Sequence, residues 1–111
     1  MRISFEDHGE TCLLAVAGDM LAENTDAFQR CVTERIESGT RNLLLEMTGL
    51  ESIDSAGLEL LLWTAEELAH RSGRMKLVGV HGTVAEALRV TRMNSRFELA
   101  GSVEDAARGL R

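Results

Sequence analysis

The sequence predicts an α/β fold in one domain, residues 1–111, built on a mixed β-sheet. Short apolar runs alternate along the chain with longer segments whose apolar residues recur at helical spacing. Turn-forming Gly, Asp, Asn and Ser residues separate these segments. The chain is 44% hydrophobic over 111 residues, which is enough for one buried core. We expect about four to five strands and about four helices, in the order β-β-α-β-α-β-α-β-α.

The strands are expected in five short segments. The second, third and fourth of these are continuous apolar runs, which is typical of buried strands in a largely parallel or mixed sheet. The first is a short edge strand that ends in a turn, and the fifth is a brief strand near the end of the chain. The predicted strands are residues 3–6, 11–18, 42–47, 75–80 and 97–99.

The helices are expected between the strands. Phe28, Val32 and Ile36 repeat at four-residue spacing and predict the first helix, with a cap at Asn24 or Thr25. The predicted helices are residues 25–38, residues 55–71, a shorter helix capped by Thr83 and a last helix opened by Ser102. One stripe on the second helix is expected to face the core: Leu58, Leu61, Leu62, Ala65, Leu68 and Ala69.

The composition narrows the classes of function. A net charge of −6 argues against nucleic-acid binding and against attraction to an anionic membrane surface. No apolar run approaches the ~20 residues of a membrane span, and no signal-peptide pattern is present, so we expect a cytoplasmic protein without membrane insertion. Cys12 and Cys31 lack CxxC spacing and are expected to be buried free thiols. The histidines lack ligand spacing and no phosphate-binding glycine loop occurs, so neither a metal nor a cofactor is expected.

Ser55 offers the chemistry that the rest of the chain lacks. It follows Asp54 and precedes Ala56 and Gly57, at the predicted junction between a strand and the second helix. Free backbone N–H groups and the positive end of the helix dipole collect at such a position and favour a phosphate. From the residues alone, Ser55 is either a helix cap, a role that Asp and Ser both suit, or a regulatory serine.

A catalytic role for Ser55 is disfavoured. A nucleophile elbow has glycine two residues before its serine, and Ile53 stands there. No histidine can be assigned as its base from spacing. We therefore expect no catalytic residues and no enzymatic activity.

With these residues the chain resembles the STAS domain family, which sulfate transporters and bacterial anti-sigma factor antagonists share. The resemblance extends over essentially the whole chain. In the antagonists, the serine directly after the aspartate is phosphorylated by a partner anti-sigma factor that is itself a kinase. The resemblance thus implies that Ser55 is the phosphoacceptor and that the partner is an anti-sigma factor serine kinase. It rests on the element order, the turn at Gly18 and Asp19, the strand at 43–48, the run Asp54-Ser55-x-Gly57-Leu58, the strand at 73–80 and the helix at 84–94.

Two positions depart from the family pattern. Ala56 stands where many antagonists have Ser or Thr, which removes a second hydroxyl but keeps a small side chain beside Ser55. Leu21 stands where many carry an acidic residue after the glycine of the first loop, although Asp19 and Glu23 are near. Ser55 itself is retained.

The implied mechanism is a charge switch. Phosphorylation of Ser55 adds roughly −1.5 to −2 of charge, which the helix N-terminus tolerates. A partner surface that accepts a neutral hydroxyl beside Asp54 would not tolerate it, so the complex should dissociate without unfolding the domain. The alternative is a STAS subunit that docks on the cytosolic side of a membrane transporter, such as the ABC lipid-trafficking systems.

The partner surface is expected near the start of the second helix. At about 100° per residue, Leu60 and Trp63 fall opposite the predicted core stripe and next to each other. An exposed Leu–Trp pair with a charged rim has the composition of an interface anchor. Alternatively, the pair covers a neighbouring helix or forms a homodimer contact. The predicted partner-binding residues are Asp54, Ser55, Ala56, Gly57, Leu60 and Trp63.

Overall fold

The computed structural model describes residues 1–110. Within them the chain forms five β-strands and four α-helices in the predicted order, so the expected α/β fold is confirmed. Two short 3-10 helices, η1 (Ala22–Asn24) and η2 (Asn94–Arg96), lie in the connections. The strands are β1 (Arg2–His8), β2 (Thr11–Met20), β3 (Asn42–Ile53), β4 (Arg74–Val78) and β5 (Glu98–Ala100), and the helices are α1 (Thr25–Glu37), α2 (Ser55–Ala69), α3 (Gly82–Val90) and α4 (Val103–Arg108).

The strands form one sheet in sequence order, from β1 to β5. The first pair is antiparallel and the other pairs are parallel, so the sheet is mixed, as predicted. The β1–β2 hairpin closes through a two-residue turn, in which Gly9 adopts a φ of +63° that favours glycine. Because α1, α2 and α3 connect parallel neighbours, the carboxyl ends of β2 and β3 lie at the same edge of the sheet. The α2 helix begins at that edge.

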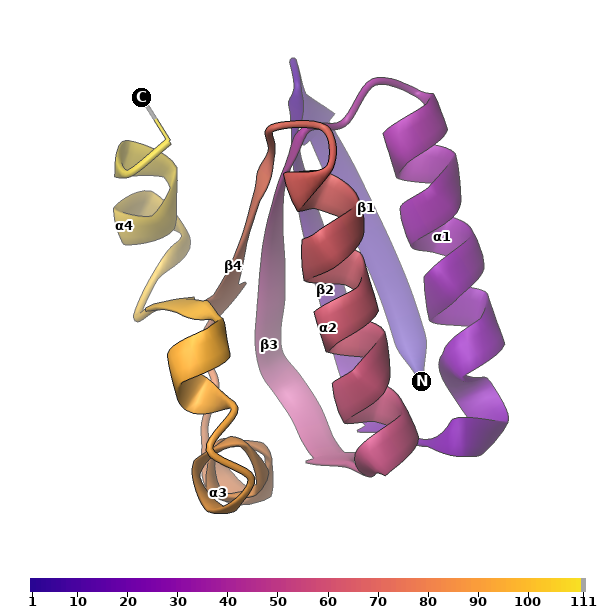
Figure 1. The fold of residues 1–111 in the computed structure, drawn as a ribbon, viewed down its shortest axis with the longest axis vertical. Coiled ribbons are helices and arrows are strands. Elements are labelled where there is room, and N and C mark those ends of the chain that lie inside the picture. Colours follow the sequence, from indigo (N-terminus) through magenta and orange to yellow (C-terminus); the bar gives the residue numbers. More distant parts are fainter. Residues whose placement is uncertain (111) are drawn as a thin grey trace.

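The helices cover the two faces of the sheet unequally. Figure 1 shows α1 and α2 side by side over one face, and the main core lies beneath them. Side chains alternate between the faces of a strand, so Leu43 and Leu45 join this core while Leu44 faces the other way. There Leu44 packs with Val78 and with Ala106 of the short helix α4.

The β3 strand is longer than the sequence predicts. Residues 42–47 are predicted as the strand, but β3 runs on to Ile53. Its polar second half pairs with β2, up to the pair Met20–Ile53. A Cβ at Gly49 would lie 2.9 Å from the Cβ of Ala17, so a small residue fits this close approach. Asp54 alone therefore separates β3 from α2.

The helix caps were predicted correctly in part. The Ser102 hydroxyl accepts the Asp105 amide at 3.2 Å and opens α4, as expected. Thr83 was expected to cap α3, but the cap position is His81, and the Thr83 hydroxyl instead donates to the Glu51 carbonyl of β3. That bond ties α3 to the extended part of β3.

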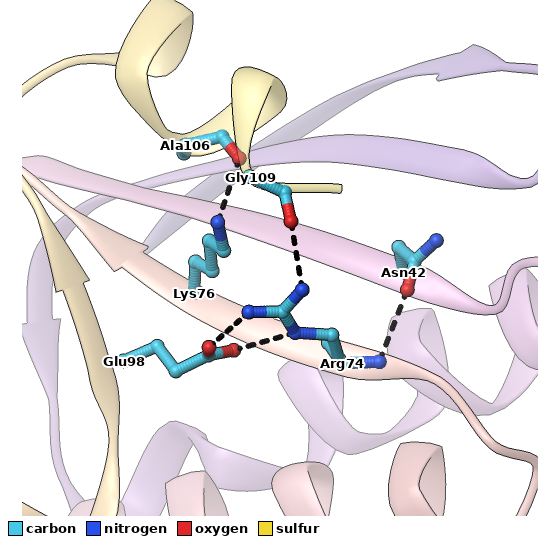
Figure 2. A network of polar contacts seen from close by, with 6 residues as sticks. All are labelled: Asn42, Arg74, Lys76, Glu98, Ala106 and Gly109. Carbon is cyan, nitrogen blue, oxygen red and sulfur yellow. Dashed lines mark hydrogen bonds and ion pairs between the residues drawn. The ribbon is translucent and has the colours of Figure 1, made fainter. Parts of the chain in front are cut away.

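Two cations fix α4 to the sheet (Figure 2). Lys76 is buried, and its Nζ donates to the Ala106 carbonyl at 2.9 Å. The Arg74 guanidinium donates to the Gly109 carbonyl at 2.7 Å and pairs with Glu98 of β5. Carbonyls at the C-terminal end of a helix lack partners within the helix and carry partial negative charge. Lys76 and Arg74 therefore cap the end of α4.

Candidate functional site

Ser55 is the first residue of α2, and its side chain is exposed. Within residues 1–110, no hydrogen bond engages its hydroxyl. The cap position belongs to Asp54, whose extended backbone has φ −108° and ψ −174°. Of the two roles that the residues left open, the structure therefore gives the cap to Asp54 and leaves the Ser55 hydroxyl free at the helix N-terminus.

The Asp54 carboxylate holds two separate segments together. One oxygen accepts the Gly57 amide of α2 at 2.9 Å, and the other accepts the Ala22 amide of η1 at 2.9 Å. These two backbone donors, Gly57 first, lower the pKa of Asp54, because they stabilise the ionised carboxylate. Asp54 is thus a fixed negative charge beside Ser55 at neutral pH.

Gly57 lets α2 begin directly against the end of β2. A Cβ at this position would lie 2.5 Å from the Met20 carbonyl oxygen and 2.6 Å from Cγ1 of Ile53. The Met20 carbonyl also accepts the Asp54 amide at 3.2 Å, so this backbone is held on both sides. Gly57 is buried, and it shapes the site by allowing close packing.

The turn after β2 is held by polar side chains, of which the sequence predicted Asn24 only as a possible helix cap. Asn24 accepts the Leu21 amide and donates to the Asp19 carbonyl, each at 2.8 Å. The Asp19 carboxylate accepts a hydrogen bond from the Ser52 hydroxyl of β3. The Asp19 carboxylate, one of the two acidic groups noted near Leu21, thus bonds to Ser52 and not to Ser55. The sequence signal for this turn was Asn24, because an Asn side chain commonly bonds to backbone groups a few residues away.

The site carries an excess of negative charge. Asp19, Glu23, Glu51 and Glu59 are exposed, and they lie on the segments that meet at Asp54, namely the end of β2, η1, the end of β3 and the start of α2. No Lys or Arg occurs between residues 42 and 70. The positive potential at Ser55 therefore comes from the N-terminal amides of α2. A phosphate on Ser55 would join an already acidic surface.

The prediction that Leu60 is exposed was wrong. Its side chain is only 5% exposed and belongs to the main core, whereas Ala69, expected in the core, is exposed. The reason is that α2 packs against both the sheet and α1, so its buried arc is wider than one stripe and rotated toward α1. Trp63 is partly buried at the edge of this arc, where it lines a hollow with Ile36 of α1. Trp63 thus lies against a neighbouring helix, as in the stated alternative, whereas Leu60 belongs to the core.

The side of α2 that remains open carries other residues. At about 100° per residue, Ser55, Glu59, Leu62 and Glu66 follow one another along it. Ser55, Glu59 and Glu66 are exposed, and Leu62 is partly exposed while it packs on the core. Leu62 is therefore the apolar residue of α2 that shares the exposed side with Ser55.

Among residues 1–110, no three His, Cys, Asp or Glu side chains gather so that they could hold a metal ion. Within the same residues, no helix is long and apolar enough to cross a membrane. Cys12 is buried and Cys31 partly buried, and neither is in a disulfide.

Comparisons with known proteins identify the family. The STAS domain model matches residues 2–106. BtrV of Bordetella bronchiseptica, which carries the name of an anti-sigma factor antagonist, is 24% identical over 96% of this chain and 92% of its own. A Thermotoga maritima structure described as an anti-sigma factor antagonist superposes with a TM-score of 0.89 at 18% identity, covering 96% of this chain and 92% of that one. The phosphorylated form of SpoIIAA from Bacillus gives 0.76 at 18% identity, covering 99% and 100%. The fold expected from the resemblance is thus confirmed, and the chain belongs to the STAS domain family.

Proposed function

We propose that this protein is an anti-sigma factor antagonist that binds an anti-sigma factor serine kinase when unphosphorylated and is released by phosphorylation of Ser55. The observation that carries the proposal is the free Ser55 hydroxyl at the start of α2, beside the fixed carboxylate of Asp54. Relatives that bear the name of anti-sigma factor antagonists support it. A related fold solved in a phosphorylated form supports a phosphate-based switch.

The switch acts through charge. A phosphate would add roughly −1.5 to −2 of charge beside Asp54. No Lys or Arg between residues 42 and 70 could offset that charge. The N-terminal amides of α2 would offset part of that charge, so the fold is retained. A partner surface fitted to the neutral hydroxyl would have to bury the new charge, which is costly. A 100-fold loss of affinity corresponds to about 2.7 kcal/mol.

The partner surface is proposed around the start of α2. Ser55 and Ala56 present side chains there, while Asp54 and Gly57 position them. Leu60 is not included, because it is buried in the core. The proposed binding partner is a protein, and neither a catalytic residue nor a cofactor of this chain takes part. Such a switch would operate in the cytoplasm, where ATP and the transcription machinery are found.

Phosphorylation with the anti-sigma factor kinase of the same organism and ATP tests the proposal. Fragmentation mass spectrometry should place a single phosphate on Ser55. The Ser55→Ala variant should remain unmodified, and Ser52→Ala is the matched control, which should still be phosphorylated. Phosphate on Ser52 or Thr48 with Ser55 unmodified would refute the assignment.

A further inference from the structure

We propose that the groove between α1 and α2 is a second docking surface, which takes a basic amphipathic helix of a partner protein. The groove, here the Trp63 groove, is a hollow of about 160 Å³ on the outer surface of the two helices. The inference does not depend on phosphorylation of Ser55. The groove is lined by Thr33, Ile36, Glu37, Trp63, Glu67 and Arg71.

The floor of the Trp63 groove is apolar. Trp63 and Ile36 are partly buried and pack against the main core, and the rest of each side chain lines the hollow. The hollow of about 160 Å³ has room for one anchoring side chain. A tryptophan in a pocket with a polar rim is the usual setting of an interface hot spot.

The two helices that form the groove carry mostly acidic side chains, and the lining itself holds Glu37, Glu67 and Arg71. Arg35 of α1 is turned toward β1, where it pairs with Asp7 and lies over the Phe5 ring. Apart from Arg35, residues 25–37 and 55–71 carry six carboxylates and two arginines. Their net charge is therefore −4, in a chain whose total net charge is −6. Arg71 is already paired with Glu67 at 3.1 Å. The carboxylates are Asp26, Glu34, Glu37, Glu59, Glu66 and Glu67, and the arginines are Arg30 and Arg71.

This charge pattern selects the occupant. A second copy would bring the same acidic surface against itself, and like charges facing each other disfavour association. A nucleic acid or an anionic lipid surface would be repelled for the same reason. A groove between two helices with an apolar floor suits the apolar face of a third helix, and Lys or Arg along its edges would meet the acidic side chains of α1 and α2.

The Trp63 groove lies apart from the phosphoacceptor. Trp63 is eight residues beyond Ser55 on α2, which is roughly 12 Å along the helix axis. This separation exceeds the screening length of about 8 Å at physiological ionic strength. Binding in the groove should therefore respond little to a charge placed on Ser55.

Fluorescence can test the proposal, because Trp63 is the only tryptophan and the chain has no tyrosine. The probe is a synthetic amphipathic Lys/Leu helix without tryptophan, titrated into the full chain. We expect a saturable shift of the Trp63 emission to shorter wavelength that weakens as salt is raised. The Glu37→Lys variant should bind about tenfold more weakly, which is about 1.4 kcal/mol. Glu104→Lys on α4 makes the same change in net charge and should bind like the parent chain.

Four results would overturn the proposal. Equal binding of a peptide with the same composition in scrambled order would show attraction by net charge alone, as would equal losses in Glu37→Lys and Glu104→Lys. An emission shift that depends on protein concentration without peptide would assign the groove to a second copy. Loss of peptide binding in Ser55→Asp would show that the groove is not a separate surface.

Discussion

The Asp54 carboxylate accepts the backbone amide of Ala22, which lies 32 residues earlier in the chain, at 2.9 Å. Its second oxygen caps α2 through the Gly57 amide, so one side chain serves both the helix and the turn after β2. The surface around Ser55 is therefore built from two chain segments that the ionised Asp54 side chain joins.

Replacing Asp54 by Asn should lower the melting temperature most at neutral pH. An Asn side chain has one carbonyl oxygen, so it can accept from Ala22 or Gly57 but lacks the charge that strengthens both bonds. Because these bonds lower the pKa of Asp54 in the folded chain, its contribution is full above about 3.9, the ordinary value, and is lost as pH falls through the folded-state pKa. Circular dichroism melts across pH should show the gap between parent and variant shrinking in acid. A gap that stays constant down to about pH 2 would contradict this role.

Replacing Ser55 by Asp should weaken binding of the anti-sigma factor kinase, whereas Ser55→Ala should retain it. Aspartate adds charge at the start of α2, where it also favours the helix, so the fold should be unchanged. Isothermal titration with the purified kinase would measure the difference, expected at about tenfold or more, or about 1.4 kcal/mol. If Ser55→Ala lost as much affinity as Ser55→Asp, the hydroxyl itself and not the charge would carry recognition.

Replacing Gly57 by Ala should destabilise the chain by about 1–3 kcal/mol through overpacking. The new Cβ would lie 2.5 Å from the Met20 carbonyl oxygen, a backbone atom that also accepts the Asp54 amide. Gly101→Ala is the matched control, because a Cβ there meets nothing within 4 Å. Urea denaturation should give a lower free energy of unfolding for Gly57→Ala than for Gly101→Ala. Equal stability would mean that β2 and α2 can move apart at no cost.

The order of elements followed from the sequence because the apolar runs and the helical spacing are strong local signals. The extension of β3 was missed because Thr48, Gly49 and Ser52 form no apolar run, and only pairing with β2 makes them a strand. The burial of Leu60 was missed for a related reason. The periodicity of one helix reports one packing partner, whereas α2 has two, the sheet and α1.

The candidate site was predictable only at its centre. Asp54 and Ser55 stood out as a capping residue and a hydroxyl at a helix start, and both lie there. The roles of Ala22, Met20 and Ser52 were not visible, because each depends on a contact between segments about 30 residues apart. Such contacts leave no pattern in a single sequence.

The two cysteines should differ in reactivity. Burial, followed by the hydrogen bond to Asp7, raises the pKa of Cys12 to about 12, so almost no thiolate forms at neutral pH. Burial also raises the pKa of Cys31, but this side chain on α1 is partly exposed. Mass spectrometry after iodoacetamide treatment of the folded chain should show slow labelling of Cys31 and none of Cys12. Labelling of both at equal rates, before unfolding, would contradict the burial of Cys12.

Replacing Lys76 by Met should weaken the attachment of α4 to the sheet and leave the sheet itself unchanged. Methionine fills the space of the lysine stem but cannot donate to the Ala106 carbonyl, and a bond of this charged type contributes about 1.5–3 kcal/mol. The ammonium lies beside Gly109, where a Cβ would meet Nζ. Arg74 still holds the Gly109 carbonyl in the variant, so α4 should remain attached at one point (Figure 2).

Amide hydrogen exchange can resolve this local effect. In Lys76→Met we expect faster exchange in residues 103–110 and unchanged protection in β3 and α2, since α4 packs on the smaller cluster of Leu44 and Val78 rather than on the main core. A double variant that also carries Arg74→Met should remove the remaining attachment and increase exchange further. If Lys76→Met instead accelerated exchange evenly through the chain, α4 would be part of one cooperative unit with the main core.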